Sequence, residues 1–289
     1  MFEQQLRFQA AAFSVELFGR KRSAGALDEA FHRLVDVLEP ALFIEAGAFD
    51  ARASIGVASR HPECHVVAYE ASERNFADIT AQGISEKGVD YRHAAVGERA
   101  GQVSFWENQT DAVGLRGANS VGRSLDPSLA RIETSVSMVR LDDEFEPSHQ
   151  GGVALWVDVE GFALEVFRGS KKLLHSVDLI KVEVEDRESW AGQALAVDVI
   201  SFLLDSGLIP VFRDAEYEDQ YNVVFISERF LSTGKPQHVI EDFFRTSQHA
   251  LHGDPSSLRT NPRLRALARP VRAAANSGLQ RLRRQGHIT

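Results

Sequence analysis

The chain has 289 residues, and 44% of them are apolar, so it can bury the core of one large α/β domain or of two small domains. Its single cysteine excludes an internal disulfide framework and a multi-cysteine zinc site. Polar residues begin at Glu3, and no apolar run approaches about 18 residues. These features predict a cytoplasmic protein without a secretory leader or a transmembrane segment.

The net charge of −9 is distributed unevenly along the chain. Residues 245–289 hold nine arginines and one acidic residue, a balance of about +8, which leaves about −17 for residues 1–244. The contrast predicts a separate basic C-terminal extension, 233–289, and the acidic body argues against nucleic acid as a partner. The extension could contact an anionic membrane, nucleic acid, or the acidic body of its own or a neighbouring chain, and the last is favoured.

Residues 1–40 are predicted to form a helical cap, because apolar residues recur at three- and four-residue steps from Leu27 to Leu38 before Pro40. A homo-oligomer formed through these helices or the basic tail is one alternative. Over residues 41–232, strand-like runs alternate with helix-compatible segments, which predicts an α/β domain with a mostly parallel sheet covered on both faces. The expected strands are 42–45, 66–70, 89–94, 103–106, 154–159, 179–185, 209–213 and 222–226.

Two further segments refine this architecture. The last two strand-like runs flank a polar stretch, 214–220, that is too short for a crossover helix, so they are expected to form an antiparallel hairpin at the sheet edge. This ending is typical of methyltransferases that use S-adenosylmethionine (SAM) and unusual for dehydrogenases. Residues 108–137 are rich in Gly, Ser, Asn and Asp without a sustained period, which predicts a long loop on the acceptor side.

The segment from Phe43 to Asp50 predicts a nucleotide-cofactor site. A strand ends at Glu45, Gly47 provides a tight turn, and Glu70 closes the next strand 25 positions later, near the spacing of about 20 for a ribose-binding acid. The loop lacks the further glycines that a dinucleotide pyrophosphate requires. Carboxylates at Glu45 and Asp50 suit the cationic aminoacyl end of SAM, although an ordinary strand–turn–helix remains the alternative from these residues alone.

A second buried strand ends in two carboxylates, Asp158 and Glu160, followed by Gly161. Carboxylates are costly inside a strand but face the ligand crevice at its carboxyl end. One could hold the methionine ammonium or order the acceptor, while the other accepts a hydroxyl proton. Both reach the crevice only if the strand ends between them and Gly161 turns the chain. A strand that simply ends at an acidic turn is the alternative.

Taken together, these motifs resemble the FkbM family of methyltransferases over residues 42–229. The resemblance implies a SAM-dependent O-methyltransferase with a seven-stranded Rossmann-like fold, acting on hydroxyls of small molecules such as polyketides, of sugars or of glycolipids. The segments that carry it are Ile44–Asp50, Ala68–Ser72 with Asn75, Ala94–Gly97, Arg140–Asp143 and Asp158–Gly161, which continues to Gly169.

The resemblance also implies roles for individual residues. The aminoacyl end of SAM is expected at Glu45 and Gly47, and its ribose hydroxyls at Glu70. The remaining cofactor and catalytic positions implied are Ala95 and Val96 near the adenine, and Asp158 and Glu160 facing the sulfonium and the acceptor.

Four positions depart from the family pattern. Ala51 stands where glycine is frequent, Ala71 where proline is usual, Trp156 where lysine is usual, and Ala163 where glutamate is common. These departures leave a catalytically weakened SAM-binding or partner-binding module as the alternative function. No metal site is expected, because the histidines form no H-E-x-x-H pair, and His93, His149 and His175 lie in unrelated contexts.

Overall fold

A computed structural model describes residues 20–108, 117–127, 130–147, 151–214, 217 and 219–243. The helices are α2 (Arg20–Leu38), α3 (Arg52–Arg60), α4 (Glu73–Thr80), α5 (Leu141–Glu144), α6 (Ala163–Arg168), α7 (Ala196–Asp205) and α8 (Glu228–Ser232), with short 3-10 turns at Ser85–Lys87 and Leu173–Ser176. The strands are β1 (Pro40–Ala46), β2 (His65–Glu70), β3 (Val89–His93), β4 (Ala95–Val96), β5 (Gly101–Asn108), β6 (Arg131–Val139), β7 (Gly152–Val157), β8 (Leu179–Glu185), β9 (Leu208–Arg213) and β10 (Gln220–Ser227).

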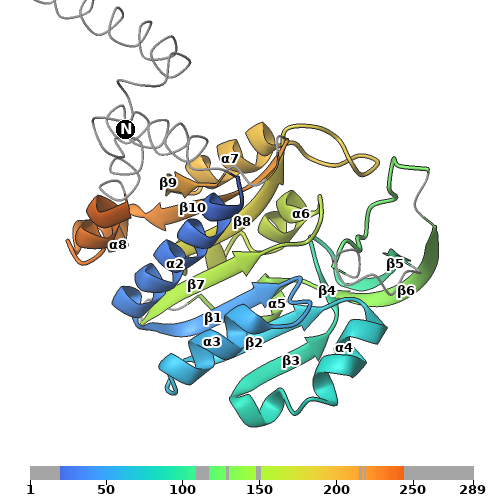
Figure 1. Ribbon diagram of the computed structural model, residues 1–289, viewed down its shortest axis with the longest axis horizontal. Helices are drawn as coiled ribbons and strands as arrows, with labels where there is room; N and C mark the ends of the chain where they lie inside the picture. Colours follow the sequence, from blue (N-terminus) through green and yellow to red (C-terminus); the bar gives the residue numbers. More distant parts are fainter. Residues whose placement is uncertain are drawn as a thin grey trace, which may run out of the picture. The chain divides into compact units, whose positions relative to one another are not determined.

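The main sheet has seven strands in the order β3-β2-β1-β7-β8-β10-β9 (Figure 1). The neighbours from β3 to β8 pair in parallel, whereas β10 is antiparallel to both β8 and β9. The expected mostly parallel sheet with an antiparallel edge hairpin is therefore confirmed. This order places β1 and β7 side by side at the centre, so the loops that follow them meet at one edge of the sheet.

Successive side chains of each strand point to opposite faces of the sheet and belong to two separate apolar clusters. Phe43 of β1 packs into the cluster that also contains buried residues of α2, α3 and α8. Ile44, the next residue, packs into the cluster formed with α5, α6 and α7. Helices thus cover both faces, as the apolar strands require.

The predicted N-terminal helix is present over Arg20–Leu38, and residues 1–19 lie outside the described part. Leu27, Phe31 and Leu34 of this helix are completely buried in the cluster on one face of the sheet. The apolar stripe that predicted the helix therefore covers the sheet of its own chain.

The compact body extends beyond the expected boundary at residue 232. Val239, Ile240 and Phe243 are buried in the cluster under α2, and the ring centroid of Phe243 lies 4.2 Å from that of Phe212. The boundary of the basic extension is therefore corrected from 232 to about residue 244, where the compact unit of the chain ends. The remainder of the extension lies outside the described residues.

The expected long loop at residues 108–137 was wrong in part, because Arg131–Val139 forms the strand β6. This strand pairs antiparallel with β5 and parallel with β4 in a second, three-stranded sheet set apart from the main one (Figure 1). The expected strand at 103–106 therefore belongs to the second sheet as part of β5. The sequence did not indicate β6 because residues such as Ser135 and Ser137 are polar. One face of a small antiparallel sheet can remain in water, so its strands need not be apolar throughout.

Replacing Phe243 by Ala should lower the free energy of unfolding by about 3 kcal/mol, because a buried ring that packs on Phe212 is lost. Val197→Ala is the matched control, since Val197 is 65% exposed on α7 and its truncation should change stability by no more than about 0.5 kcal/mol. Urea denaturation of both variants measures the difference. Equal stabilities would place residues 233–243 outside the cooperative core.

Candidate active site

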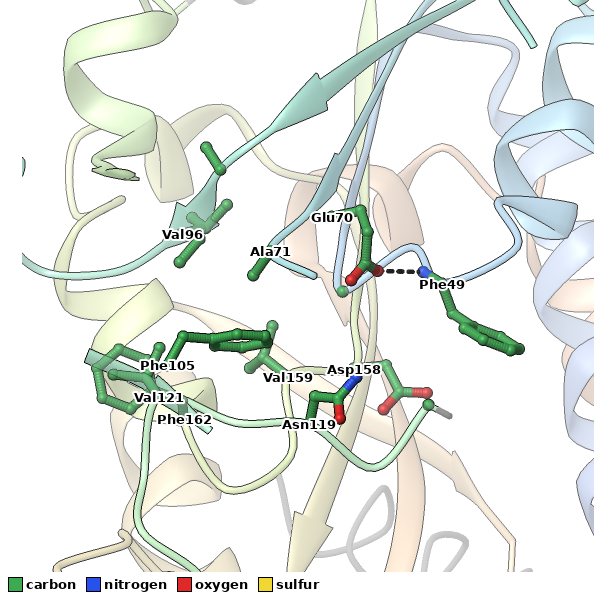
Figure 2. A pocket seen from close by; sticks show the side chains of 14 residues that line it. Phe49, Glu70, Ala71, Val96, Phe105, Asn119, Val121, Asp158, Val159 and Phe162 are labelled. Atoms are coloured by element: carbon green, nitrogen blue, oxygen red, sulfur yellow. Dashed lines mark hydrogen bonds between the residues drawn. The ribbon is translucent and has the colours of Figure 1, made fainter. Parts of the chain in front are cut away.

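The pocket that bears on function lies at the carboxyl ends of β1, β2 and β7, where the second sheet faces the main one (Figure 2). Ligands of open α/β sheets bind at this edge because the loops after the strands converge there. The residues that line the pocket are Gly47, Phe49, Glu70, Ala71, Ala94, Ala95, Val96, Phe105, Gly117, Asn119, Val121, Asp158, Val159 and Phe162.

Gly47 connects the loop after β1 to the loop after β7. Its φ of 81° lies in the left-handed region, and a Cβ at this position would fall 1.7 Å from the carbonyl oxygen of Asp158. The Asp158 amide donates to the Ala46 carbonyl over 2.9 Å, which holds the two loops together. Glycine is therefore required at position 47 because the backbone of Asp158 packs against it. The sequence had suggested glycine at this position only for a tight turn beside a ligand.

Glu70 ends β2 and is 5% exposed. One of its carboxylate oxygens accepts a hydrogen bond from the Phe49 amide and the other from the Ser72 amide, each over 2.7 Å. Burial raises the pKa of Glu70 to about 7, although these backbone hydrogen bonds favour the ionised form. The Asn75 side chain also forms a hydrogen bond with this carboxyl group, and because a carboxylate has about four lone-pair sites, the group can still accept a bond from a ligand in the pocket that it lines.

Glu45 and Asp50 are near this loop but do not line the pocket. An oxygen of Glu45 accepts hydrogen bonds from the Ser54 amide, over 3.0 Å, and from the Ser54 hydroxyl, which connects β1 to the first turn of α3. Burial raises the pKa of Glu45 to about 8. Asp50 forms an ion pair with Arg52, with 2.8 Å between Nε and Oδ2. The Glu45 carboxylate therefore binds the start of α3 and the Asp50 carboxylate binds Arg52, and neither lines the pocket.

An apolar slot occupies the other end of the pocket. Ala71 and Val96 lie on one side of it, and Phe105 and Phe162 lie on the other (Figure 2). Ala95 and Val96, which the resemblance placed near an adenine, both line the pocket. A flat apolar slot of this kind suits the face of an aromatic base.

Several lining residues had no signal in the sequence. Phe105 belongs to β5, and Asn119 and Val121 belong to residues 117–127, which were expected to lie in a featureless loop. Asn119 and Val121 flank Ser120, which forms a bridge with Trp106 of β5, and neither local periodicity nor a motif indicates that pairing. Of these residues, only Phe105 lies in a segment that was predicted to be a strand, and the sequence did not indicate where that strand lies in the fold.

The two carboxylates after β7 lie close together, but the strand ends at Val157, before both of them and not between them as expected. Glu160 has a φ of 48° and Gly161 a φ of 81°, so two successive left-handed residues reverse the chain. Single carboxylate oxygens of Asp158, Glu160 and Glu183 all lie within 4.8 Å of one another. Of these three, Asp158 also lines the pocket described above, whereas Glu160 and Glu183 do not.

Burial raises the pKa of all three of these carboxyl groups, and their mutual repulsion adds to the effect at Glu160 and Glu183. Burial likewise raises the pKa of Glu185, the next acid on the same face of β8, to about 7. The positive charge of Lys181 acts in the opposite direction on Asp158. The site is therefore a dense acidic centre that is incompletely compensated by cations.

Trp156 and Lys181 form a pair across β7 and β8. The Lys181 ammonium lies 3.4 Å from the centroid of the Trp156 ring and 2.6 Å from a carboxylate oxygen of Asp28 on α2. Such a cation–π contact with an ion pair stabilises a lysine that is 4% exposed. Trp156 therefore packs behind the site rather than in it.

The other departures from the family pattern are also accommodated. Ala51 has a φ of 53° and precedes α3, so it occupies a left-handed position that glycine would adopt without strain. Ala163 is buried as the first residue of α6, and Ala71 lines the apolar slot. None of the four positions places a charged group in the pocket, and its acidic lining residues, Glu70 and Asp158, are retained.

The sequence of residues 45–218 matches the model of the methyltransferase FkbM domain. The chain belongs to the FkbM methyltransferase family. The match covers both strand ends described above, with Glu70 and the Asp158–Gly161 turn, and thus confirms the resemblance seen in the motifs. No curated protein matches this FkbM-family chain.

Several solved structures match part of this chain at low sequence identity. The FkbM methyltransferase from Methylobacillus flagellatus KT is 10% identical with a TM-score of 0.43, over 65% of this chain and 44% of that one, so this chain spans less than half of its length. Magnesium protoporphyrin IX methyltransferase from Synechocystis PCC 6803, with bound SAM, is 10% identical with a TM-score of 0.41, over 72% and 80% of the two chains. Fibrillarin of Aeropyrum pernix, with natively bound SAM, is 11% identical with a TM-score of 0.39, over 66% and 68%.

Gly47→Ala should destabilise the protein by roughly 2 kcal/mol or more, because a methyl group would overlap the Asp158 carbonyl in addition to straining a left-handed residue. Gly207→Ala is the control: its φ of 82° is nearly the same, but no atom lies within 4 Å of the added methyl. The difference between the two midpoints of urea unfolding isolates the overlap. Equal losses would show that the loops after β1 and β7 can move apart at little cost.

Proposed function

We propose that this FkbM-family protein is a SAM-dependent O-methyltransferase that methylates a hydroxyl of a small molecule, a sugar or a glycolipid. The observation that carries the proposal is the fixed Glu70 carboxyl group in a pocket that leads directly to the acidic centre at Asp158 and Glu160. The apolar slot, the Glu70 carboxyl group and the anionic end at Asp158 offer partners for the adenine, the ribose and the aminoacyl group of SAM, in which the ribose is the middle group.

The chemistry of the lining residues supports this cofactor over a phosphorylated one. None of the described residues that line the pocket is a lysine or an arginine, which a pyrophosphate would favour. In this proposal Asp158 receives the methionine ammonium and Glu70 the ribose hydroxyls. Glu45 and Asp50 act indirectly, by fixing the loop that contains Gly47 and the start of α3.

Methyl transfer moves the methyl group from the sulfonium of SAM to the acceptor oxygen, and the hydroxyl proton must leave that oxygen. Glu160 is the proposed proton acceptor, because it lies beside Asp158 in a largely buried position. Its raised pKa suits a base near neutral pH. The protein otherwise has to align donor and acceptor, since the sulfonium already carries the activation.

The alternative, a weakened SAM-binding or partner-binding module, rested on Trp156 and Ala163. Trp156 lies behind the site on Lys181, and Ala163 is buried in α6, so neither departure argues for an inactive centre. Among the described residues no helix is long and apolar enough to cross a membrane. The cytoplasmic location, the absence of a nucleic-acid partner and a homo-oligomer remain parts of the proposal that rest on sequence.

The purified chain should bind SAM and S-adenosylhomocysteine but not NAD, and Glu70→Ala should weaken that binding by about 1–3 kcal/mol because hydrogen bonds to a charged acceptor are lost. Calorimetry with all three ligands measures this, with Glu63→Ala as the control, since Glu63 is exposed in the turn before β2. Binding of NAD but not of SAM would contradict the proposed function. A Glu70→Ala variant with unchanged affinity for SAM would show that Glu70 does not contact the cofactor.

Asp158→Asn and Glu160→Gln should separate the two roles. Asp158→Asn should impair SAM binding, whereas Glu160→Gln should leave binding nearly intact and reduce turnover by roughly 100-fold or more, the size of a general-base contribution. Radiolabelled SAM and an extract of the host first identify the acceptor, and calorimetry then accompanies the rate measurements. Full turnover by Glu160→Gln would assign the proton to another acceptor.

A further inference from the structure

The backbone amides after β1 are already used within the protein. The Gly47 amide donates to the Tyr69 carbonyl over 3.0 Å, and the Ala48 amide donates to the same oxygen over 2.9 Å. The Phe49 amide donates to the Glu70 carboxylate over 2.7 Å. In open α/β folds the amides of this loop commonly hold an anionic group of the ligand. An anionic group that enters this pocket therefore needs a different donor.

That donor can be identified among the side chains of the pocket. Asn119 is the only one of the described lining residues whose side chain carries N–H groups. It is 8% exposed and belongs to the segment between β5 and β6. The other described lining residues are glycine, apolar residues or the two acids Glu70 and Asp158. Asn119 is thus the one side chain of this set that presents a hydrogen-bond donor in every ionisation state.

A hydrogen bond to β5 fixes the orientation of the Asn119 amide. Its Oδ1 accepts from the backbone amide of Asn108 over 2.8 Å. Because a backbone N–H can only donate, the atom that it contacts must be the oxygen of the side-chain amide, and Nδ2 is the other terminal atom. Figure 2 shows this nitrogen on the side of the Asn119 amide that faces Asp158.

The backbone beside Asn119 is also held in place. The carbonyl of Ala118 accepts from the Asn108 side chain and from Arg131, each over 2.7 Å. The Asn119 amide group is therefore positioned before any ligand arrives, which lowers the entropy that binding costs. Its Nδ2 has two hydrogens, so it can donate to a ligand and retain a second bond within the chain.

The aminoacyl end of SAM needs such a donor next to an acid. Its ammonium and its carboxylate are attached to the same carbon atom, so the partners of the two groups must be neighbours. Asp158 is the proposed partner of the ammonium, and it would repel the carboxylate unless a donor stood beside it. A lysine or arginine in that place would pair with Asp158 and compete with the ammonium, whereas a neutral amide does not.

We propose that Asn119 binds the carboxylate of the aminoacyl group of SAM through its Nδ2 and thereby makes the site selective for a cofactor with a complete amino-acid group. The inference rests on the proposed function for the identity of the cofactor. It assigns a role in binding to the segment between β5 and β6.

The test compares two ligands by calorimetry on the full-length chain: SAM, and decarboxylated SAM, which keeps the ammonium but lacks the carboxylate. Wild type should bind SAM more tightly. Asn119→Asp should bind SAM more weakly by about tenfold or more, because an anionic acceptor replaces the donor that faces the carboxylate. The same variant should bind decarboxylated SAM at least as tightly as wild type does, because the added negative charge attracts the ammonium.

Asn119→Asp separates ligand binding from local folding. An aspartate oxygen can still accept from the Asn108 amide, so the melting temperature of the ligand-free variant should stay close to that of wild type. Gln82→Glu is the matched control, since it makes the same exchange of amide for carboxylate at an exposed residue after α4 that does not line the pocket. It should bind both ligands as wild type does.

Two results would overturn the inference alone. Equal losses of affinity for the two ligands would show that Asn119 only supports the fold of the pocket, and unchanged SAM binding by Asn119→Asp would assign the carboxylate to another donor. In both cases SAM binding by wild type leaves the proposed function standing. A wild-type chain that binds neither SAM nor S-adenosylhomocysteine would instead overturn the proposed function, and the role of Asn119 with it.

Discussion

The contact between Gly47 and the backbone of Asp158 is the constraint on which the site depends. The hydrogen bond from the Asp158 amide to Ala46 continues the pairing of β1 with β7 beyond the strand ends, and the left-handed glycine allows the two loops to touch. The loop after β1 contains Phe49, whose amide binds Glu70, and the loop after β7 contains Asp158 and Glu160. Their relative position is therefore fixed by backbone geometry, which changes less than side-chain rotamers do.

Much of the main sheet could be predicted because its strands are buried on both faces. Such strands are continuous apolar runs, and the acidic residues and glycines that end them mark the ligand edge. Glu70 and Asp158 could be found in this way. The hydrogen bond from Ser54 to Glu45 could not be predicted, because it depends on where α3 begins. The residue before that helix, Ala51, is left-handed, but neither glycine nor proline marks this position in the sequence.

The second sheet shows where local patterns stop being informative. Its strand β6 has a polar face, and its pairing with β5 joins segments separated by residues that carry no period. Phe105 and Val121 nevertheless form part of the slot that faces Val96. The side of the pocket that would select an acceptor and cover an adenine thus depends on long-range pairing. The acidic cluster of Asp158, Glu160 and Glu183 has the same origin, since Glu183 approaches Asp158 through the alignment of β8 with β7.

Lys181 connects the charge of the site to a helix that does not line it. Its ammonium is shared between the Trp156 ring and Asp28 of α2, while the same charge lowers the pKa of Asp158. The acid strength of a residue in the pocket is thus set in part from the opposite layer of the fold, and Asp28 opposes Lys181 in that effect. Substitutions on α2 can consequently alter the acidity of Asp158 without any change in the pocket itself, so that variation in a covering helix becomes a means of tuning this acidic centre.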